Sequence, residues 1–199
     1  DRARLDLSGW QVASCGAEPI AHDTIDRFAE AFAPAGFRRE AFFPAYGMAE
    51  YTLLISLKRE SVAPTVLSLD PATLERGVVS EAKAGIAPVR QVVGCGVPVG
   101  DTRVVIAHPE TLSRCAVQQV GEIWLAGAST TQGYWNNPEE TARTFGATLR
   151  DTGEGPFLRT GDLGFVRDGE VFVTGRLKDL LIVRGRNHYP QDIERTVEQ

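Results

Sequence analysis

The chain has 199 residues, of which 43% are hydrophobic and 24% charged, a composition typical of a globular protein and not of a disordered one. The formal net charge is −5, so composition gives no electrostatic reason to expect nucleic-acid binding. No apolar run approaches the roughly 18 residues that a membrane span requires. The three cysteines form no C-x-x-C pair, which argues against a metal or redox signature and favours a reducing cytoplasm.

The first quarter of the sequence predicts one strand, one helix and a second strand. Residues 10–14 are expected to form a short buried strand. A helix should follow with Asp23 as its N-cap, because apolar residues then recur at helical spacing until Pro34 stops the pattern. Residues 44–47 are expected to form a turn-rich joint. Elements in this order indicate one unit of an α/β layer.

From residue 89 onward the pattern favours β strands. Asp168 and Gly169 are typical of a two-residue hairpin turn. Short β-branched stretches, bounded by Gly, Asp or Pro, predict strands at residues 103–107, 122–126 and 171–174. We therefore expect a small, mostly antiparallel β unit.

Three further stretches complete the expected organisation. Asn137 and Pro138 are a strong helix start, residues 180–183 read as an apolar strand, and a last helix should begin near Tyr189. Residues 57–88, rich in Pro and Gly, fit neither neighbour and are interpreted as an insertion. The expected segments are an α/β part at residues 1–56, the insertion at residues 57–88, a β-barrel-like part at residues 89–177 and a short final part at residues 178–199.

Three short motifs contain residue types suited to nucleotide chemistry. Residues 16–19 put a glycine after a strand, where a flat ligand can approach the backbone. In residues 46–50 an aromatic ring can stack on a base, and Glu50 can hold a metal ion that bridges phosphates. Asp162, placed after a tight turn, can accept hydrogen bonds from both ribose hydroxyls. Each motif alone is also compatible with an ordinary turn, a core aromatic or a solvated acid.

A fourth motif combines arginine with a charge-rich turn. Residues 175–180 follow an expected strand and precede the polar run 184–190. Arginine suits bidentate contact with phosphate, and such a turn between two strands suits a hinge. A solvated charged turn is the alternative interpretation.

Together and in this order, the motifs resemble those of the adenylate-forming superfamily of acyl-CoA synthetases, peptide-synthetase adenylation domains and luciferases. Residues 121–145 add a fifth, long match. Within the superfamily the chain is most similar to the fatty acyl-AMP ligases, in the form of residues 16–19 and in the run 184–194. Ala49 stands where acyl-CoA synthetases usually carry Thr, and residues 57–88 fall where these ligases carry an extra segment.

The resemblance implies a fold and a set of site residues. The fold would be α/β, part of the N-terminal domain of an adenylate-forming enzyme (an α/β layer plus a small distorted antiparallel β-barrel) with the start of the C-terminal domain. Glu50 would hold Mg²⁺, Asp162 would bind the ribose, Arg176 would contact the nucleotide and Lys178 would stand at the hinge. The remaining expected nucleotide contacts are Gly16, Ala17, Glu18, Tyr46 (stacked on adenine), Gly47, Met48 and Ala49. Glu50 and Arg176 would be the catalytic members.

The implied activity uses ATP and Mg²⁺ to convert a fatty acid to an acyl-adenylate, in lipid or polyketide biosynthesis. The acyl group would then pass to the phosphopantetheine thiol of an acyl carrier protein. The family's phosphate loop and C-terminal catalytic lysine do not occur in these residues, so the 199 residues alone are expected not to form adenylate. Two alternatives stay open: an acyl-CoA synthetase, and a non-catalytic nucleotide-binding module.

Overall fold

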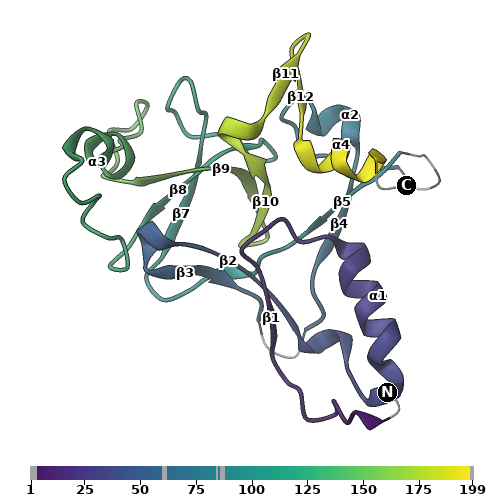
Figure 1. Ribbon diagram of the computed structural model, residues 1–199. Coiled ribbons are helices and arrows are strands. Elements are labelled where there is room, and N and C mark those ends of the chain that lie inside the picture. Colours follow the sequence, from purple (N-terminus) through teal and green to yellow (C-terminus); the bar gives the residue numbers. More distant parts are fainter. Residues whose placement is uncertain (1–3, 60–61, 84, 86–87, 198–199) are drawn as a thin grey trace.

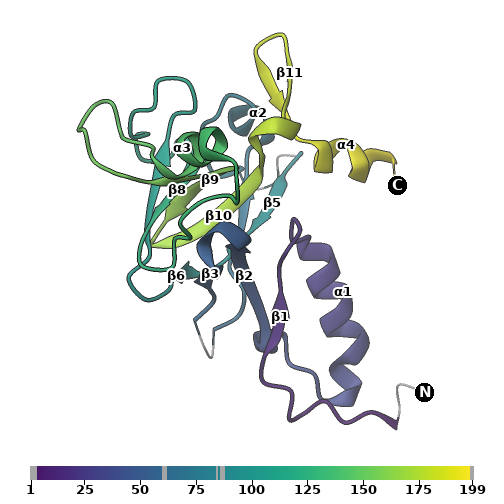
Figure 2. The same cartoon turned by 60° about the vertical axis from the view of Figure 1, so that its left-hand side comes forward.

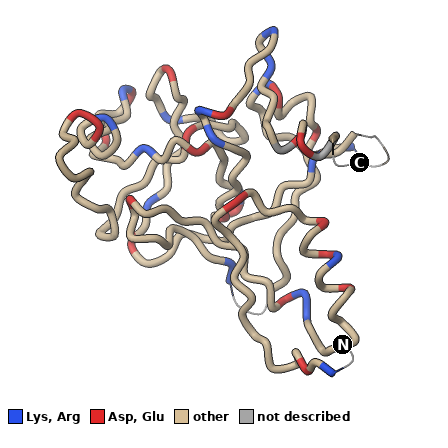
Figure 3. Tube along the Cα trace, viewed as in Figure 1, with Lys and Arg blue, Asp and Glu red and all other residues tan. Residues whose placement is uncertain are grey.

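The computed structural model describes residues 4–59, 62–83, 85 and 88–197. Two four-stranded sheets form its centre, and two smaller strand pairs lie outside them (Figure 1). Figure 3 shows acidic and basic residues distributed along the whole trace. In the described part of the chain, no helix combines the length and apolar character needed to cross a membrane.

The first sheet has the strand order β1-β2-β3-β6. Strand β1 pairs in parallel with β2, whereas β2 with β3 and β3 with β6 are antiparallel. Helix α1 lies beside β1 and packs its apolar side on β1 and β2 (Figures 1 and 2). The bounds of these elements are β1 Ala13–Cys15, α1 His22–Phe32, β2 Phe42–Met48, β3 Leu53–Leu57 and β6 Val97–Pro98. The expected strand–helix–strand unit is thus confirmed.

The second sheet is antiparallel throughout, with the order β10-β9-β8-β7, as expected for the β unit. Its strands are β7 Arg103–Ala107, β8 Gly121–Ala126, β9 Leu158–Arg167 and β10 Glu170–Arg176. Asp168 and Gly169 form the predicted hairpin turn with φ values of 52° and 79°. Helix α3, Pro138–Phe145, starts as predicted, because the Asn137 side chain accepts a hydrogen bond from the Glu140 N–H.

Two strand pairs flank the second sheet. Strand β4, Val66–Leu69, pairs with β5, Arg90–Val93, and is followed by the short helix α2, Pro71–Leu74. Strand β11, Leu181–Val183, pairs with β12, Arg186–His188, and the predicted last helix is α4, Pro190–Val197. The β11–β12 hairpin projects from the rest of the molecule in both views (Figures 1 and 2).

Buried side chains join these parts. Tyr51, Ile55, Ile123 and Leu125 are fully buried where the two sheets pack together. A second cluster joins the β4–β5 region and Tyr189 to the side chains of β9 and β10. One apolar cluster therefore joins the two sheets, and a separate one joins the β4–β5 pair to the second sheet.

Three expectations near the N-terminus were wrong in detail. Only residues from Ala13 onward form the first strand, because only these find partners on β2, and Trp10 is 41% exposed. Ala21 occupies the N-cap position of α1 without a side-chain bond, and Asp23 lies inside the first turn. Residues 44–47 are not a turn but part of β2, since β1 and β3 hold this segment on both sides.

The tight turn expected before Asp162 is also absent from the described fold. Residues 158–163 belong to β9, which contains an irregularity at this point. The strand expected at 180–183 exists as β11, but its three side chains are 50–68% exposed instead of packed as in an apolar core strand.

Candidate functional site

A cavity of about 360 Å³ lies between the loop that follows β1, strand β2, strand β5 and the β9–β10 pair. Its size falls within the range of small-molecule pockets, about 300–1,000 Å³. Six residues selected from the sequence line it: Ala17, Glu18, Tyr46, Gly47, Asp162 and Arg176. The fold therefore brings together all four short motifs, which are separated by up to about 160 positions.

The Asp162 carboxylate is at the centre of the polar contacts in this cavity. Asp162 is 7% exposed. Oδ2 accepts a hydrogen bond of 2.6 Å from the Tyr46 hydroxyl, and Oδ1 lies 3.2 Å from Nε of Arg176. Burial raises the pKa of Asp162 above its usual range, while the Tyr46 hydrogen bond and the Arg176 charge oppose this rise.

Tyr46 is fixed by its place on β2. It pairs with Ser56 of β3, and burial together with the neighbouring Asp162 raises its pKa well above the usual value. The phenol therefore stays protonated at neutral pH and remains a hydrogen-bond donor. Its ring contributes to the wall of the cavity, where a planar base can contact it.

Arg176 and Asp162 are direct register partners on β10 and β9. A bulge in β10 between Val173 and Gly175 sets this register, and the Thr174 hydroxyl donates a hydrogen bond of 3.2 Å to the carbonyl of Leu163. The Arg176 side chain is 61% exposed, so its guanidinium is accessible to a bound anion.

The loop after β1 approaches β2 closely. A Cβ on Gly16 would lie 2.8 Å from the carbonyl oxygen of Ala45, so glycine is required by packing. Ala17 has a positive φ of 72°. Ala17 and Glu18 thereby form one rim of the cavity, although Gly16 itself is not among its described lining residues.

Glu50 lies outside the described lining of the cavity, in the short turn Ala49–Tyr51. Its Oε1 accepts a hydrogen bond of 2.7 Å from the Tyr134 hydroxyl. No cluster of three or more His, Cys, Asp or Glu side chains suited to a metal occurs among the described residues. A single oriented carboxylate nevertheless fits Mg²⁺, which in phosphate chemistry commonly takes one or two carboxylates and completes its shell with phosphate and water.

The remaining sequence candidates have other environments. Met48 packs against the core between the two sheets, and Ala49 is exposed. Lys178 is exposed in the short turn Leu177–Asp179 between β10 and the β11–β12 hairpin. None of these three is among the described residues that line the cavity.

Sequence reasoning missed several lining residues. Arg90 and Thr174 face the same cavity, and Arg90 donates a hydrogen bond of 3.0 Å to the Thr174 carbonyl. Cys95 also lines it, and burial raises the pKa of this thiol to about 12, so it is not a thiolate nucleophile at neutral pH. Only tertiary contacts reveal these residues, since each lies in a short strand or connection without a motif.

A nucleoside monophosphate fits this donor and acceptor set. An aromatic wall can contact a base, a buried carboxylate can accept from ribose hydroxyls, and an exposed guanidinium can bind phosphate. The Mg²⁺, adenine, ribose and hinge roles of the individual residues remain predictions.

Comparisons with known proteins agree with this chemistry. The family model described as AMP-binding enzyme matches residues 1–135. The chain is 55% identical to the medium-chain-fatty-acid acyl-carrier-protein ligase JamA of Moorena producens, over 100% of this chain and 34% of that protein. It is 45% identical to the putative fatty-acid–CoA ligase fadD21 of Mycobacterium leprae, with the same two coverages.

A solved structure extends the likeness to three dimensions. The fatty acyl-adenylate ligase from L. pneumophila, in complex with acyl adenylate and pyrophosphate, has a TM-score of 0.83 and 43% sequence identity, over 98% of this chain and 34% of that one. This confirms the α/β fold expected from the sequence. The chain spans about a third of the length of the relatives it matches. Since the family model covers more than half of its residues, the chain belongs to the AMP-binding enzymes.

Proposed function

We propose that the full-length protein is a fatty acyl-AMP ligase that passes its acyl group to a carrier-protein thiol. The observation that carries the proposal is the cavity in which Asp162 lies between Tyr46 and Arg176, beside Ala17 and Glu18. The name of JamA supports a fatty acid and an acyl carrier protein as partners. The L. pneumophila complex supports acyl-adenylate as the species formed.

In this proposal Tyr46 stacks on adenine, Gly16, Ala17 and Glu18 border the base, and Asp162 accepts from the ribose hydroxyls. A carboxylate oxygen of the fatty acid bonds to the α-phosphorus of ATP, and the bond from that phosphorus to the pyrophosphate oxygen breaks. Both reactants are anionic, so catalysis requires charge neutralisation and positioning instead of a protein nucleophile. Arg176 supplies one cation at the exposed side of Asp162.

Bound Mg²⁺ would neutralise phosphate charge. Glu50 would hold it, with Tyr134 orienting the carboxylate through the 2.7 Å hydrogen bond. In the second half-reaction the carrier thiol releases its proton to solvent, its sulfur bonds to the acyl carbon, and the bond from that carbon to the AMP oxygen breaks, so that AMP leaves. Lys178 would be the hinge between the halves, because it lies in an exposed turn before the projecting hairpin.

The test uses the full-length protein with ATP, Mg²⁺ and a fatty acid, offered either CoA or a holo carrier protein, with products followed by mass spectrometry. We expect acyl-adenylate and carrier-bound thioester with little acyl-CoA. Asp162→Ala should abolish both products, and Asp168→Asn, a change at an exposed turn where Asn tolerates the positive φ, should leave them unchanged. Efficient acyl-CoA formation would instead place the protein with the CoA ligases, as the name of fadD21 suggests for that relative. Nucleotide binding without either product would favour a non-catalytic module.

We further propose that residues 57–88 restrain the segment after Lys178 and so disfavour CoA as acceptor. The Asn187 N–H donates a hydrogen bond of 2.9 Å to the carbonyl of Glu75, and Nη1 of Arg186 lies 3.7 Å from Oε2 of the same residue. Pro71 of α2 and Glu75 line one cavity together with residues of β12 and α4, and Figure 1 shows α2 near these elements. A cytoplasmic location is proposed with the activity, on the pattern of three unpaired cysteines.

This role of residues 57–88 has its own test. Deleting them from the full-length protein should increase acyl-CoA formation, and Arg186→Ala should do so more weakly without removing β4 from its pairing with β5. Lys83→Ala, an exposed change within residues 57–88, is the control. If neither variant forms more acyl-CoA than the unaltered protein, the restraint does not exist.

A further inference from the structure

Asp162 is carried by an irregular part of β9. Glu122 pairs with Leu163, and Trp124 pairs with Arg159, so the single residue between them on β8 lies opposite three residues of β9. Those three are Thr160, Gly161 and Asp162, and Gly161 has a φ of +70°. Such a bulge changes the direction of side chains and leaves backbone groups without their regular ladder partners. Something else must therefore hold the conformation that directs Asp162.

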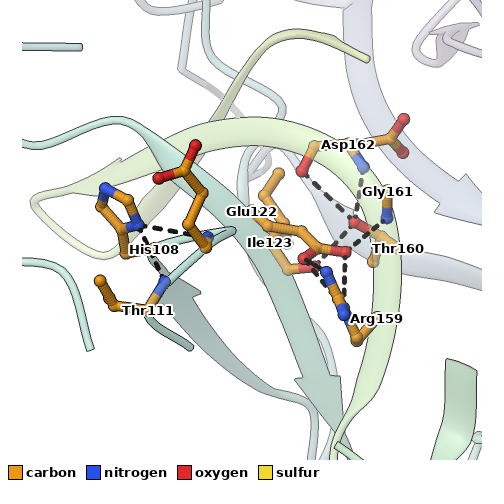
Figure 4. A network of polar contacts seen from close by, with 9 residues as sticks. His108, Thr111, Glu122, Ile123, Arg159, Thr160, Gly161 and Asp162 are labelled. Carbon is orange, nitrogen blue, oxygen red and sulfur yellow. Dashed lines mark hydrogen bonds and ion pairs between the residues drawn. The ribbon is translucent and has the colours of Figure 1, made fainter. Parts of the chain in front are cut away.

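The Glu122 carboxylate is the first group that holds the bulge in this conformation. The residue is 1% exposed although it carries a charge. Its Oε2 accepts hydrogen bonds of 2.7 Å and 3.0 Å from Nη2 and Nε of Arg159, and its Oε1 accepts one of 3.1 Å from the Gly161 N–H. Figure 4 shows this carboxylate directed at the inner side of the bulge. One buried acid thus satisfies the backbone of the bulge and the arginine that begins it.

The Thr160 hydroxyl is the second group that holds the bulge. It donates a hydrogen bond of 2.7 Å to the carbonyl of Ile123 and accepts one of 3.0 Å from the Asp162 N–H (Figure 4). The two successive N–H groups at Gly161 and Asp162 are therefore both held by side chains. Together these contacts tie the bulge to β8 at Glu122 and at Ile123, the residue it faces.

We propose that Glu122 and Thr160 are positioning residues that aim the Asp162 carboxylate at the ribose of the nucleotide. Neither is among the described lining residues of the cavity, so each acts through the backbone and not on the ligand. The inference rests on the proposed function, because it assumes that Asp162 accepts from the ribose hydroxyls. A displaced bulge would change the direction of this carboxylate while leaving the base and phosphate contacts in place.

The experiment measures the discrimination of the full-length protein between ATP and 2′-deoxy- or 3′-deoxy-ATP, as a ratio of dissociation constants. We expect the unaltered protein to favour ATP by about tenfold or more, the effect of an acceptor left without its hydroxyl partner. Glu122→Gln should reduce this ratio by about threefold or more, with the affinity for deoxy-ATP almost unchanged. A purely structural role would lower the melting temperature and leave the ratio of the folded protein as it was.

Thr160→Val is the second variant, because it keeps the shape of the side chain and removes only the hydroxyl; it decides the matter if Glu122→Gln does not fold. Glu154→Gln is the matched control: Glu154 contacts Arg103 and Arg114 near the opposite edge of the same sheet. A lower ratio in Glu122→Gln or Thr160→Val, but not in Glu154→Gln, supports the proposal. An unchanged ratio in the folded variants overturns it, provided that Asp162→Ala loses the discrimination. Should Asp162→Ala keep the discrimination, the ribose role itself is wrong and the inference is overturned with it.

Discussion

The hydroxyl of Tyr46 donates a hydrogen bond of 2.6 Å to Oδ2 of Asp162, joining β2 of the first sheet to β9 of the second. Both residues are at most 9% exposed. The bond therefore links two motifs 116 residues apart inside the wall of the cavity. In the proposed site this tyrosine would offer its ring to the base, while its hydroxyl holds the carboxylate proposed to bind the ribose.

Tyr46→Phe should weaken ATP binding by about tenfold, since a hydrogen bond to a charged group contributes about 1.5–3 kcal/mol and part of it is transmitted to the ribose contact. Isothermal titration with the full-length protein measures this loss. Tyr46→Leu removes the ring as well and should cost more than Phe. Equal affinities for the unaltered protein and the Phe variant would show that the hydroxyl has no part in nucleotide binding.

Asp162→Asn should stabilise the folded protein at pH 7 while reducing ATP affinity by about tenfold or more. Because burial raises the pKa of Asp162 above 3.8, the native state holds its proton more tightly than the unfolded state does. Stability is then lost as pH rises from about 3.8 through the raised pKa, and Asn avoids this loss. The exposed Arg176 partner offsets only part of it.

Urea unfolding at a series of pH values measures this effect. The difference between Asp162→Asn and the unaltered protein should vanish below the ordinary pKa of aspartate and grow above it. Asp168→Asn, at a side chain that is 95% exposed in the hairpin turn, is the control and should show no such growth. An Asn variant that is less stable at pH 7 would mean that the hydrogen bond and ion pair outweigh burial.

Gly47→Ala should lower stability by about 3 kcal/mol, as expected for overpacking against backbone. A Cβ at this position would lie 1.8 Å from the carbonyl oxygen of Leu53, so β2 or β3 must move. Thermal unfolding checks the size of the loss against Gly9→Ala, where a Cβ meets nothing within 4 Å. If both alanine variants have the same melting temperature, the close approach of the two strands does not constrain Gly47.

Local sequence signals predicted the elements whose causes are local. The Asp168-Gly169 turn, the Asn137 cap and strand Arg103–Ala107 depend on neighbouring residues, and the structure contains all three. Gly47 shows the limit of such reasoning. Its glycine indicated a turn, whereas the structure uses it inside β2 to let the following strand, β3, approach closely.

The residues of the site were predicted from the sequence only in part. The resemblance of ordered motifs selected Tyr46, Asp162 and Arg176, which the fold does bring together. It assigned no role to Glu122, because a single acid in an apolar strand does not reveal its partner Arg159, 37 residues away. A charged residue within the buried strand 122–126 was nevertheless a signal that a buried ion pair forms there.

Tyr134→Phe should raise the Mg²⁺ concentration required for half-maximal ATP binding by about tenfold, a typical effect of removing the partner that orients a metal ligand. The phenol donates a 2.7 Å hydrogen bond to Oε1 of Glu50 and its ring packs on Phe145, so the Phe variant loses the bond and keeps the packing. Calorimetric titration of ATP at graded Mg²⁺ measures the shift. Trp135→Phe is the matched control, since this neighbouring aromatic is 99% exposed. Should Glu50→Gln alter the Mg²⁺ requirement but Tyr134→Phe leave it unchanged, Glu50 binds the metal without help from the phenol. If neither variant changes the Mg²⁺ requirement, Glu50 is not the metal ligand.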